Sequence, residues 1–236
     1  MYAACKIEGD PIIYRDDAIL VVDKPAGMLV HRGWGRDSVV LVDIVRRMSG
    51  NSKAYPIHRL DRGASGVVLF ALDAGIAGTL GQMQRSGQIE KRYLALVRGC
   101  PPGQGVIDHP IPGKPGGQRR AAATSYRLLA TAECRPRTVS LVEVRPHTGR
   151  LHQVRRHLKH ISHPLIGDAN YGKGALNRAL AENYGLHRLA LHACRLELPH
   201  PLSGERLVIT SPLPDNLKIP LELMGFSDDG FLTGTT

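Results

Sequence analysis

Short apolar runs separated by turn residues recur along this chain and predict strands. Residues 67–71 (Val-Val-Leu-Phe-Ala) contain no polar position, which is typical of a buried strand. Residues 92–97 also predict a strand, and because side chains two apart in a strand lie on the same side, Tyr93, Ala95 and Val97 share one face. The other predicted strands cover residues 12–14, 18–22, 124–130, 138–144, 189–198 and 206–210.

Apolar residues at helical spacing lie between these strands. Asp73 can cap a helix whose Ile76, Leu80 and Met83 share one face. Further helices are predicted over residues 39–48, over about ten residues from Arg150, and near residues 176–184. Because strands dominate and helices do not alternate with them regularly, we predict an α+β fold. Its sheet is mixed and largely antiparallel, flanked by helices and loops.

Residues 100–117 break this pattern, because they are rich in Gly and Pro and show little periodicity. Arg119 and Arg120 follow them directly. We interpret the segment as a mobile basic excursion rather than a linker, since core strands continue beyond it. The chain is therefore predicted to form one domain over residues 1–236, with its core at about residues 12–212.

The net charge of the chain indicates which class of partner it is suited to bind. The 236 residues have a formal net charge of +10, which favours a polyanion, nucleic acid before membrane; a merely soluble basic protein is the alternative. No apolar run approaches the roughly 20 residues of a membrane span, and the N-terminus lacks the apolar region of a signal peptide. We expect a cytoplasmic protein. Its four separated cysteines are expected to be free thiols: Cys5, Cys100, Cys134 and Cys194.

The segment from His58 to Gly66 is the strongest candidate for chemistry. Its one carboxylate, Asp61, lies between Arg59 and Arg62, and neighbouring cations favour the ionised form. The segment leads directly into the predicted buried strand at residues 67–71, which fixes its position. A carboxylate that is fixed in position on a strongly basic chain suggests chemistry on a nucleic acid.

A second candidate is Arg155, in the helix predicted from Arg150. On a helical projection this arginine lies at the edge of the apolar face, and a buried guanidinium needs a partner. Asp61 is a candidate for that partner. Alternatively, Arg155 extends to water and Asp61 pairs with its neighbour Arg62.

Tyr93 follows two basic residues at the start of its strand. An aromatic ring in such a place can stack on a base, although a core tyrosine is the commoner outcome. Other chemistries lack their signals: the histidines between 147 and 163 do not have zinc spacing, no nucleotide-binding glycine motif occurs, and Ser65 lacks a nucleophile elbow. The tripeptide 116–118 (Gly-Gly-Gln) matches one in peptide release factors, without their other features. We expect no metal and no cofactor.

Taken together, these segments resemble the RluA family of pseudouridine synthases. Six motifs follow one another in the family's order, and Ala64, where threonine is usual, is the clear departure. The motifs lie at residues 23–27 (Asp-Lys-Pro-Ala-Gly, with Asp for the usual Asn), 58–66, 91–95 (Lys-Arg-Tyr-Leu-Ala), 148–155, 163–168 (His-Pro-Leu-Ile-Gly-Asp) and 191–193.

Within the family, the chain is most similar to the members that act on a T-stem uridine of transfer RNA, uridine 65. The similar residues are Leu29–Arg32, Trp34, Arg36, Asp37, Arg155–Leu158 and Tyr184–Leu189. As in that subgroup, no S4-like RNA-binding domain precedes the catalytic region. The resemblance implies a cofactor-free isomerase that binds structured RNA. Because no coiled-coil pattern appears, we expect a monomer with no obligate protein partner.

The resemblance also implies roles for particular residues. Asp61 is the essential carboxylate, Arg155 pairs with it, and Tyr93 packs on the target base and assists proton transfer at C5. Since a base in a duplex is out of reach, base flipping is expected, with Arg59 filling the vacated stack. The substrate-binding residues are then Arg59, His58 and Gln153.

Three other functions stay open at this point. The chain could be a ribosomal RNA pseudouridine synthase of the same family, a non-catalytic RNA-binding protein on the same scaffold, or a metal-dependent enzyme that hydrolyses RNA. The first differs only in its target. The second predicts that changing Asp61 alters affinity alone, and the third predicts loss of activity in chelator.

Overall fold

The computed structural model of the protein describes residues 10–32, 39–50, 53–113 and 117–227. The chain divides into two compact units. The first unit contains the chain up to Glu90 together with Ala193–Ser211, and the second contains Lys91–His192 together with the chain from Pro212.

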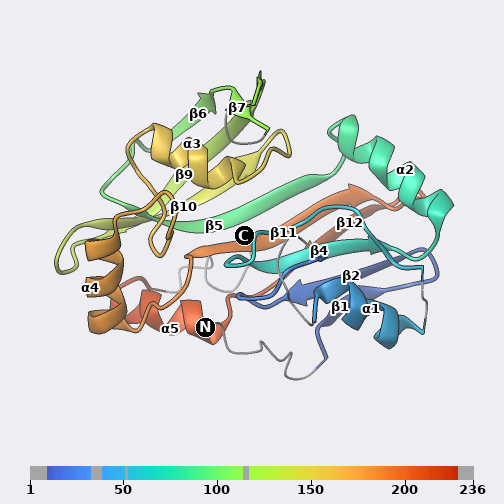
Figure 1. Ribbon diagram of the computed structural model, residues 1–236, viewed down its shortest axis with the longest axis horizontal. Coiled ribbons are helices and arrows are strands. Elements are labelled where there is room, and N and C mark those ends of the chain that lie inside the picture. Colours follow the sequence, from blue (N-terminus) through green and yellow to red (C-terminus); the bar gives the residue numbers. More distant parts are fainter. Residues whose placement is uncertain (1–9, 33–38, 51–52, 114–116, 228–236) are drawn as a thin grey trace. The chain divides into compact units, whose positions relative to one another are not determined.

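The first unit is built on strands in the order β1-β2-β4-β11, with β3 beside β4 and β12 beside β11 (Figure 1). Pairing is antiparallel for β1 with β2, β2 with β4, β3 with β4, and β11 with β12. The helices of this unit are α1 (Leu41–Ser49) and α2 (Ala74–Arg85). The strands are β1 (Ile12–Arg15), β2 (Ile19–Lys24), β3 (Tyr55–Pro56), β4 (Ser65–Ala71), β11 (Leu191–Pro199) and β12 (Arg206–Thr210).

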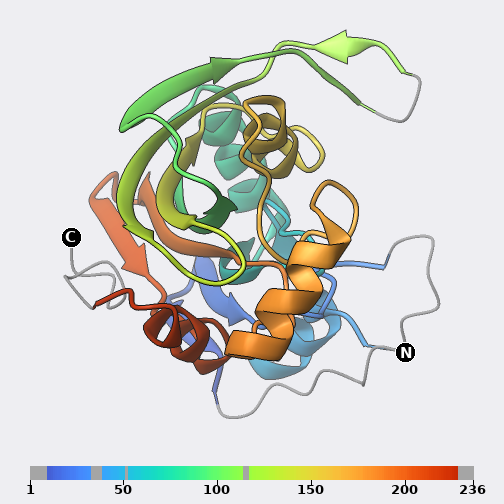
Figure 2. The same ribbon diagram turned by 90° about the vertical axis from the view of Figure 1, so that its left-hand side faces the viewer.

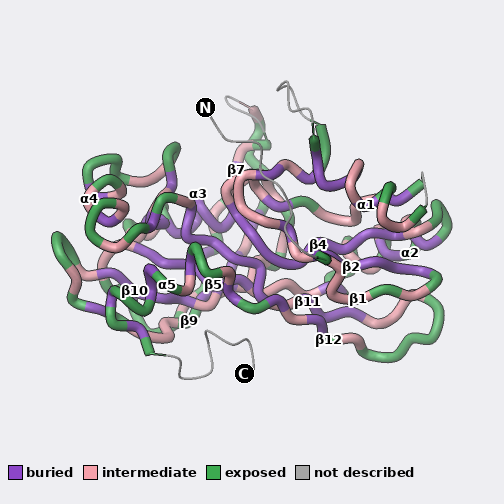
Figure 3. Tube along the Cα trace, turned by 90° about the horizontal axis from the view of Figure 1, so that it is seen from below, coloured by how far each residue is buried: buried purple, intermediate pink, exposed green. Residues whose placement is uncertain are grey.

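The core of the first unit lies along β2 and β4. All seven residues of β4 are buried, and Figure 3 shows this strand within a buried layer. Helix α2 packs against β4 and buries Ile76 and Leu80. The predicted cap is confirmed, because the Asp73 side chain accepts a hydrogen bond of 2.9 Å from the Ile76 amide.

The second unit contains strands in the order β5-β10-β9-β6. The described pairings β5–β10, β10–β9 and β9–β6 are antiparallel. A short hairpin, β7–β8, projects beyond β6 and β9 (Figure 2). The elements are β5 (Glu90–Arg98), β6 (Gln104–Asp108), β7 (Ile111–Pro112), β8 (Arg119–Arg120), β9 (Ala123–Ala132), β10 (Val139–Pro146), α3 (Gln153–His160), α4 (Gly174–Tyr184) and α5 (Asp215–Leu223).

The α+β class and the largely antiparallel pairing expected from the sequence are confirmed. Two local expectations were wrong. Residues 104–108 form an edge strand within the segment interpreted as an irregular excursion; Gly105 hides the alternation there, and the Tyr126 ring lies over this glycine. Helix α3 begins at Gln153, because His152 has a left-handed backbone with φ 53°.

The three cysteines in the described part of the chain, Cys100, Cys134 and Cys194, are free thiols, and Cys5 lies outside the described residues. None of the described helices is both long enough and apolar enough to cross a membrane.

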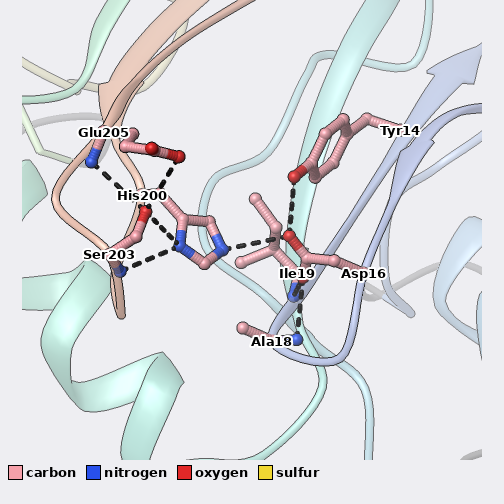
Figure 4. Close-up of polar contacts among 7 residues, drawn as sticks. All are labelled: Tyr14, Asp16, Ala18, Ile19, His200, Ser203 and Glu205. Atoms are coloured by element: carbon pink, nitrogen blue, oxygen red, sulfur yellow. Dashed lines mark hydrogen bonds and ion pairs between the residues drawn. The ribbon is translucent and has the colours of Figure 1, made fainter.

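Two turns of the first unit are tied together by a polar cluster (Figure 4). Asp16 accepts hydrogen bonds from the Ala18 and Ile19 amides, both of 2.8 Å, and from the Tyr14 hydroxyl, of 2.7 Å. Burial alone would raise the pKa of Asp16, but these bonds outweigh it and lower that pKa. His200 lies in the turn between β11 and β12, and its Nε2 is 3.0 Å from Asp16 Oδ2. The cluster therefore joins the β1–β2 and β11–β12 turns.

The packing of β4 against β11 gives a direct stability prediction. Gly66 has φ 110°, and a Cβ there would lie 2.2 Å from the Ala193 carbonyl oxygen. Gly66→Ala should therefore lower the free energy of unfolding by at least about 2 kcal/mol, measured by urea denaturation. The control is Gly78→Ala in α2, where the space is open, and it should raise that free energy by about 0.5–1 kcal/mol. Equal effects of the two changes would contradict the prediction.

Candidate active site

Asp61 lies in the loop between β3 and β4 and is partly buried. A turn closes here, since the Ala64 amide donates to the Asp61 carbonyl oxygen over 3.1 Å. The next carbonyl, that of Arg62, accepts from the Gly27 amide over 2.7 Å. The backbone that follows the Asp61 side chain is thereby held by hydrogen bonds within the first unit.

Lys24 strengthens this anchoring from inside the core. Its side chain is fully buried, and its Nζ donates to the carbonyl oxygens of Pro25 and Met28, both over 2.8 Å. A longer contact of 3.4 Å reaches the Arg62 carbonyl oxygen. A buried ammonium is tolerated when acceptors surround it, so Lys24 links residues 25–28 to the Asp61 loop.

The two expected substrate-binding residues beside Asp61 differ in setting. Arg59 is exposed, whereas His58 is partly buried, and its Nε2 accepts from the Leu69 amide over 3.2 Å. That bond ties His58 to β4 and places the proton of a neutral ring on Nδ1. Contact of either residue with substrate stays a prediction.

In the second unit, Tyr93 is buried at 8% exposure and lies in β5. It is opposite Val144 of β10, which is opposite Tyr126 of β9, and paired residues of neighbouring strands have side chains on one face. Thr124 lies two residues before Tyr126, so its side chain is on this face too. We call this the Tyr93 face.

Helix α3 packs on the Tyr93 face, as its position over β9 and β10 in Figure 1 also shows. The Thr124 hydroxyl lies 2.8 Å from His157 Nδ1 and accepts from Gln153 Nε2 over 3.0 Å. Burial lowers the pKa of His157, which favours a neutral ring inside this contact. The helix that contains Arg155 is therefore fixed on the same face as Tyr93.

Arg155 is buried and forms a two-point ion pair with Asp168. Its Nε donates to Asp168 Oδ2 over 2.7 Å, and its Nη2 donates to Oδ1 over 2.8 Å. The alternative in which Arg155 extends to water is wrong, because the guanidinium finds a carboxylate thirteen residues along the chain. Pairing of Arg155 with Asp61 stays a prediction, since the two residues belong to different units.

Additional hydrogen bonds hold the Asp168 carboxylate in position for this ion pair. Its Oδ1 also accepts from the Asn170 and Tyr171 amides, over 2.9 Å and 3.0 Å. Burial alone would raise the pKa of Asp168, but the bonds from Arg155 and these amides outweigh it and lower that pKa. Gly167 makes the turn possible: its φ is 74°, and a Cβ there would lie 1.8 Å from the Arg188 carbonyl oxygen.

Tyr171 covers the other side of the pair. The Arg155 guanidinium lies 5.1 Å from the Tyr171 ring centroid, a cation–π distance. The Tyr171 hydroxyl is 3.1 Å from His152 Nδ1. Arg155 is thus held by a carboxylate along one edge and by an aromatic ring over its plane.

Both the oxygen and the nitrogen of the Gln153 side-chain amide form hydrogen bonds with other groups of the protein. Its Oε1 accepts from the Thr148 hydroxyl and the Arg150 amide, and its Nε2 donates to the Ala123 carbonyl oxygen and to Thr124. The substrate contact expected for Gln153 stays a prediction, but this geometry favours a role in holding the turn before α3.

Sequence reasoning assigned no role to Asp168, Tyr171 or Lys24. The sequence signal for Asp168 is that a semi-buried Arg155 requires a carboxylate partner. A Gly-Asp turn after the predicted helix is one position where such a carboxylate can occur. Trp34, Arg36, Asp37 and Gly116 lie outside the described residues. In the part of the chain that is described, no group of three His, Cys, Asp or Glu side chains could hold a metal ion.

A serine–histidine–aspartate series occurs in the polar cluster of Figure 4 but lacks the geometry of a nucleophile site. Ser203 Oγ lies 3.2 Å from His200 Nδ1, and His200 Nε2 lies 3.0 Å from Asp16. However, the Ser203 backbone amide also donates to His200 Nδ1 over 3.2 Å. The nitrogen that would take the serine proton is already an acceptor in the turn, so the series holds the turn together.

Comparison with known proteins supports a catalytic interpretation. A family model described as RNA pseudouridylate synthase matches residues 18–160. A Haemophilus ducreyi protein named tRNA pseudouridine synthase C is 38% identical over 233 residues, covering 91% of this chain and 96% of that protein. A Pasteurella multocida protein of the same name is 42% identical over 216 residues, covering 84% and 89%. Among solved structures, human RNA pseudouridylate synthase domain containing 4 superposes with a TM-score of 0.74 at 26% identity, covering 90% of this chain and 92% of that chain.

Proposed function

Because the chain belongs to the RNA pseudouridylate synthase family, we propose that it converts one uridine of a transfer RNA to pseudouridine. The observation that carries the choice of transfer RNA is the similarity, over nearly the whole of both chains, to proteins named tRNA pseudouridine synthase C. The proposed target is the T-stem uridine 65, on the subgroup resemblance of residues such as Arg155–Leu158 and Tyr184–Leu189.

The reaction exchanges one bond of the base for another. The N1–C1′ bond breaks, the uracil turns, and a C5–C1′ bond forms. The proton lost from C5 is balanced by one gained at N1, so no oxidant or reductant is needed. Asp61 is the proposed essential carboxylate: it either attacks C1′, as the nucleophile of a retaining glycosidase does, or removes a sugar proton to give a glycal.

Arg155 and Tyr93 are the proposed partners of Asp61. The two-point ion pair with Asp168 fixes the orientation of the Arg155 guanidinium, and a guanidinium carries five N–H donors, so it can serve more than one carboxylate. We assign Asp61 as a second carboxylate partner of this cation, which would orient Asp61 for the reaction. Tyr93 packs on the flipped base, and the exposed Arg59 takes the vacated place in the stack.

Exposed cations of the second unit supply the proposed affinity for the RNA backbone. Arg119 and Arg120 lie in the β7–β8 hairpin, and Lys159 lies on α3; all three are exposed. Arg156, which donates to the Pro112 carbonyl oxygen, links α3 to that hairpin. Phosphate contacts of this kind weaken as salt rises.

The proposal is tested with purified protein and transcripts that contain uridine tritiated at C5. Tritium should be released from a whole transfer RNA transcript, and replacement of uridine 65 by cytidine should abolish the release. Release from ribosomal RNA transcripts alone would overturn the transfer RNA assignment and leave the family reaction standing. Release from neither RNA would contradict the proposed activity.

A further inference from the structure

Lys91 lies in β5, two residues before Tyr93, and belongs to the second unit. Side chains two residues apart in a strand point to the same face, so Lys91 lies on the Tyr93 face. This is the face on which α3 holds Arg155 through the bonds to Thr124. The chain thus places a second cation on the sheet face that carries two of the proposed catalytic residues.

The surroundings of Lys91 differ from those of the other cations near it. Arg155 is paired with Asp168, and Arg92 lies 3.6 Å from Glu143. Lys91 is partly buried, and within the described part of the chain it has no hydrogen bond or ion pair. Burial lowers its pKa to about 8, and no neighbouring carboxylate counters that effect. An ammonium whose hydration is reduced by burial and that has no partner in the protein is unfavourable, so this position suits a group that meets its acceptor in the bound RNA.

We propose that Lys91 is a further catalytic residue, which donates a hydrogen bond to a carbonyl oxygen of the target uracil and stabilises the negative charge of the detached base. This inference rests on the proposed function, in which Tyr93 packs on that base. Positions two apart in a strand are separated by about 7 Å, so an acceptor on a base at Tyr93 lies within reach of a lysine side chain.

When the N1–C1′ bond breaks, its electron pair stays with the uracil, and negative charge spreads over N1 and the carbonyl oxygens. The deficit at C1′ is met by Asp61, as an ester or by removal of a C2′ proton. The C5–C1′ bond then forms as the Asp61 ester bond breaks or, on the glycal route, as Asp61 returns the proton to C2′; C5 loses a proton, and N1 gains one. Lys91 stays protonated throughout and lowers the energy of the anionic base, which a positioned donor does best away from water.

A uracil oxygen is favoured over a phosphate because of where Lys91 lies. The cations suited to the RNA backbone, Arg119, Arg120 and Lys159, are exposed, whereas Lys91 is partly buried on the Tyr93 face. A phosphate contact would contribute to affinity and its salt dependence. A contact to the developing anion contributes to the rate of the bound complex instead.

The test uses Lys91→Met in the full chain, with tritium release measured in single turnover at saturating transfer RNA. The rate constant should fall by about 100-fold or more, as for loss of one donor to a developing anion. The Kd for the RNA should change by less than about twofold, since the contact forms with the transition state. Lys91→Arg keeps the charge and should recover much of the rate. The control, Lys173→Met, removes an exposed lysine of the same unit and should change neither quantity.

Two results would overturn the inference. If Lys91→Met weakens RNA binding and lowers its salt dependence but keeps the rate of the bound complex, Lys91 contacts a phosphate. If Lys91→Met loses rate only together with its native fold, and Lys91→Arg does not restore activity, the lysine is structural. Failure of the proposed function itself is distinguished by the unaltered protein, which would then release no tritium from any RNA.

Discussion

Asp61→Asn is expected to abolish pseudouridine formation while the protein still folds and binds RNA. The substitution keeps the shape of the side chain and removes its charge, so it can neither attack the sugar nor take a proton from it. Loss of such a group lowers turnover by about a thousandfold or more. The measurement is tritium release in single turnover, with RNA affinity determined by filter binding on the same samples.

The matched control is Asp17→Asn, because Asp17 is an exposed aspartate of the same unit and should leave activity unchanged. Substantial turnover by Asp61→Asn would remove this residue from the centre of the chemistry. A protein that only binds RNA would show a change in affinity with no activity to lose, and a metal-dependent enzyme would lose activity in chelator.

The second large effect is expected for Asp168→Asn. This change removes the charge of the carboxylate that accepts two hydrogen bonds from Arg155, a residue that is only 7% exposed. Breaking a buried pair in this way costs about 3–5 kcal/mol of unfolding free energy, to be measured by urea denaturation. Activity should fall as well, because Arg155 loses the contact that fixes its orientation.

Two further variants make this result specific. Glu222→Gln removes the exposed partner of Lys218, 3.8 Å away on α5, and should change stability by less than about 1 kcal/mol. Combining Asp168→Asn with Arg155→Met removes both buried charges and should recover much of the stability, but none of the activity. Recovery of activity in that double variant would show that the pair serves the fold alone.

The pH dependence of stability offers an independent check on Asp168. Its pKa is lowered in the folded protein, so its stabilising contribution is present above the unfolded value of about 3.9. That contribution is lost as the pH falls through the lower folded value. Asp168→Asn should therefore be less sensitive than the unaltered protein to acid in this range, as seen by thermal unfolding across pH.

Most strands could be predicted because apolar runs determine them locally. Strand β4 is an uninterrupted apolar run, and its burial follows from that pattern alone. Strand β6 could not be predicted in this way. Gly105 occupies the position where an apolar side chain would have completed the alternation, and the reason is a tertiary contact, the Tyr126 ring that lies over it.

The candidate site shows the same division between local and tertiary information. The helical pattern predicts that Arg155 is semi-buried and needs a partner, but not that Asp168 supplies it from a turn after the helix. That turn depends on Gly167 and on backbone amides, which have no periodic signature. In the same way, the late start of α3 depends on the backbone of one residue, His152.

The ammonium group of Lys24 acts as a built-in cation that holds the backbone of the Asp61 loop. Its ammonium group sits among the Pro25, Met28 and Arg62 carbonyl oxygens much as a bound potassium ion would, but it is tethered to β2 and fully buried. Dissolved ions cannot exchange with it or screen it as they screen surface charge. Raising the salt concentration should therefore release the RNA while leaving the catalytic loop in its shape, so that activity lost at high salt returns in full on dilution.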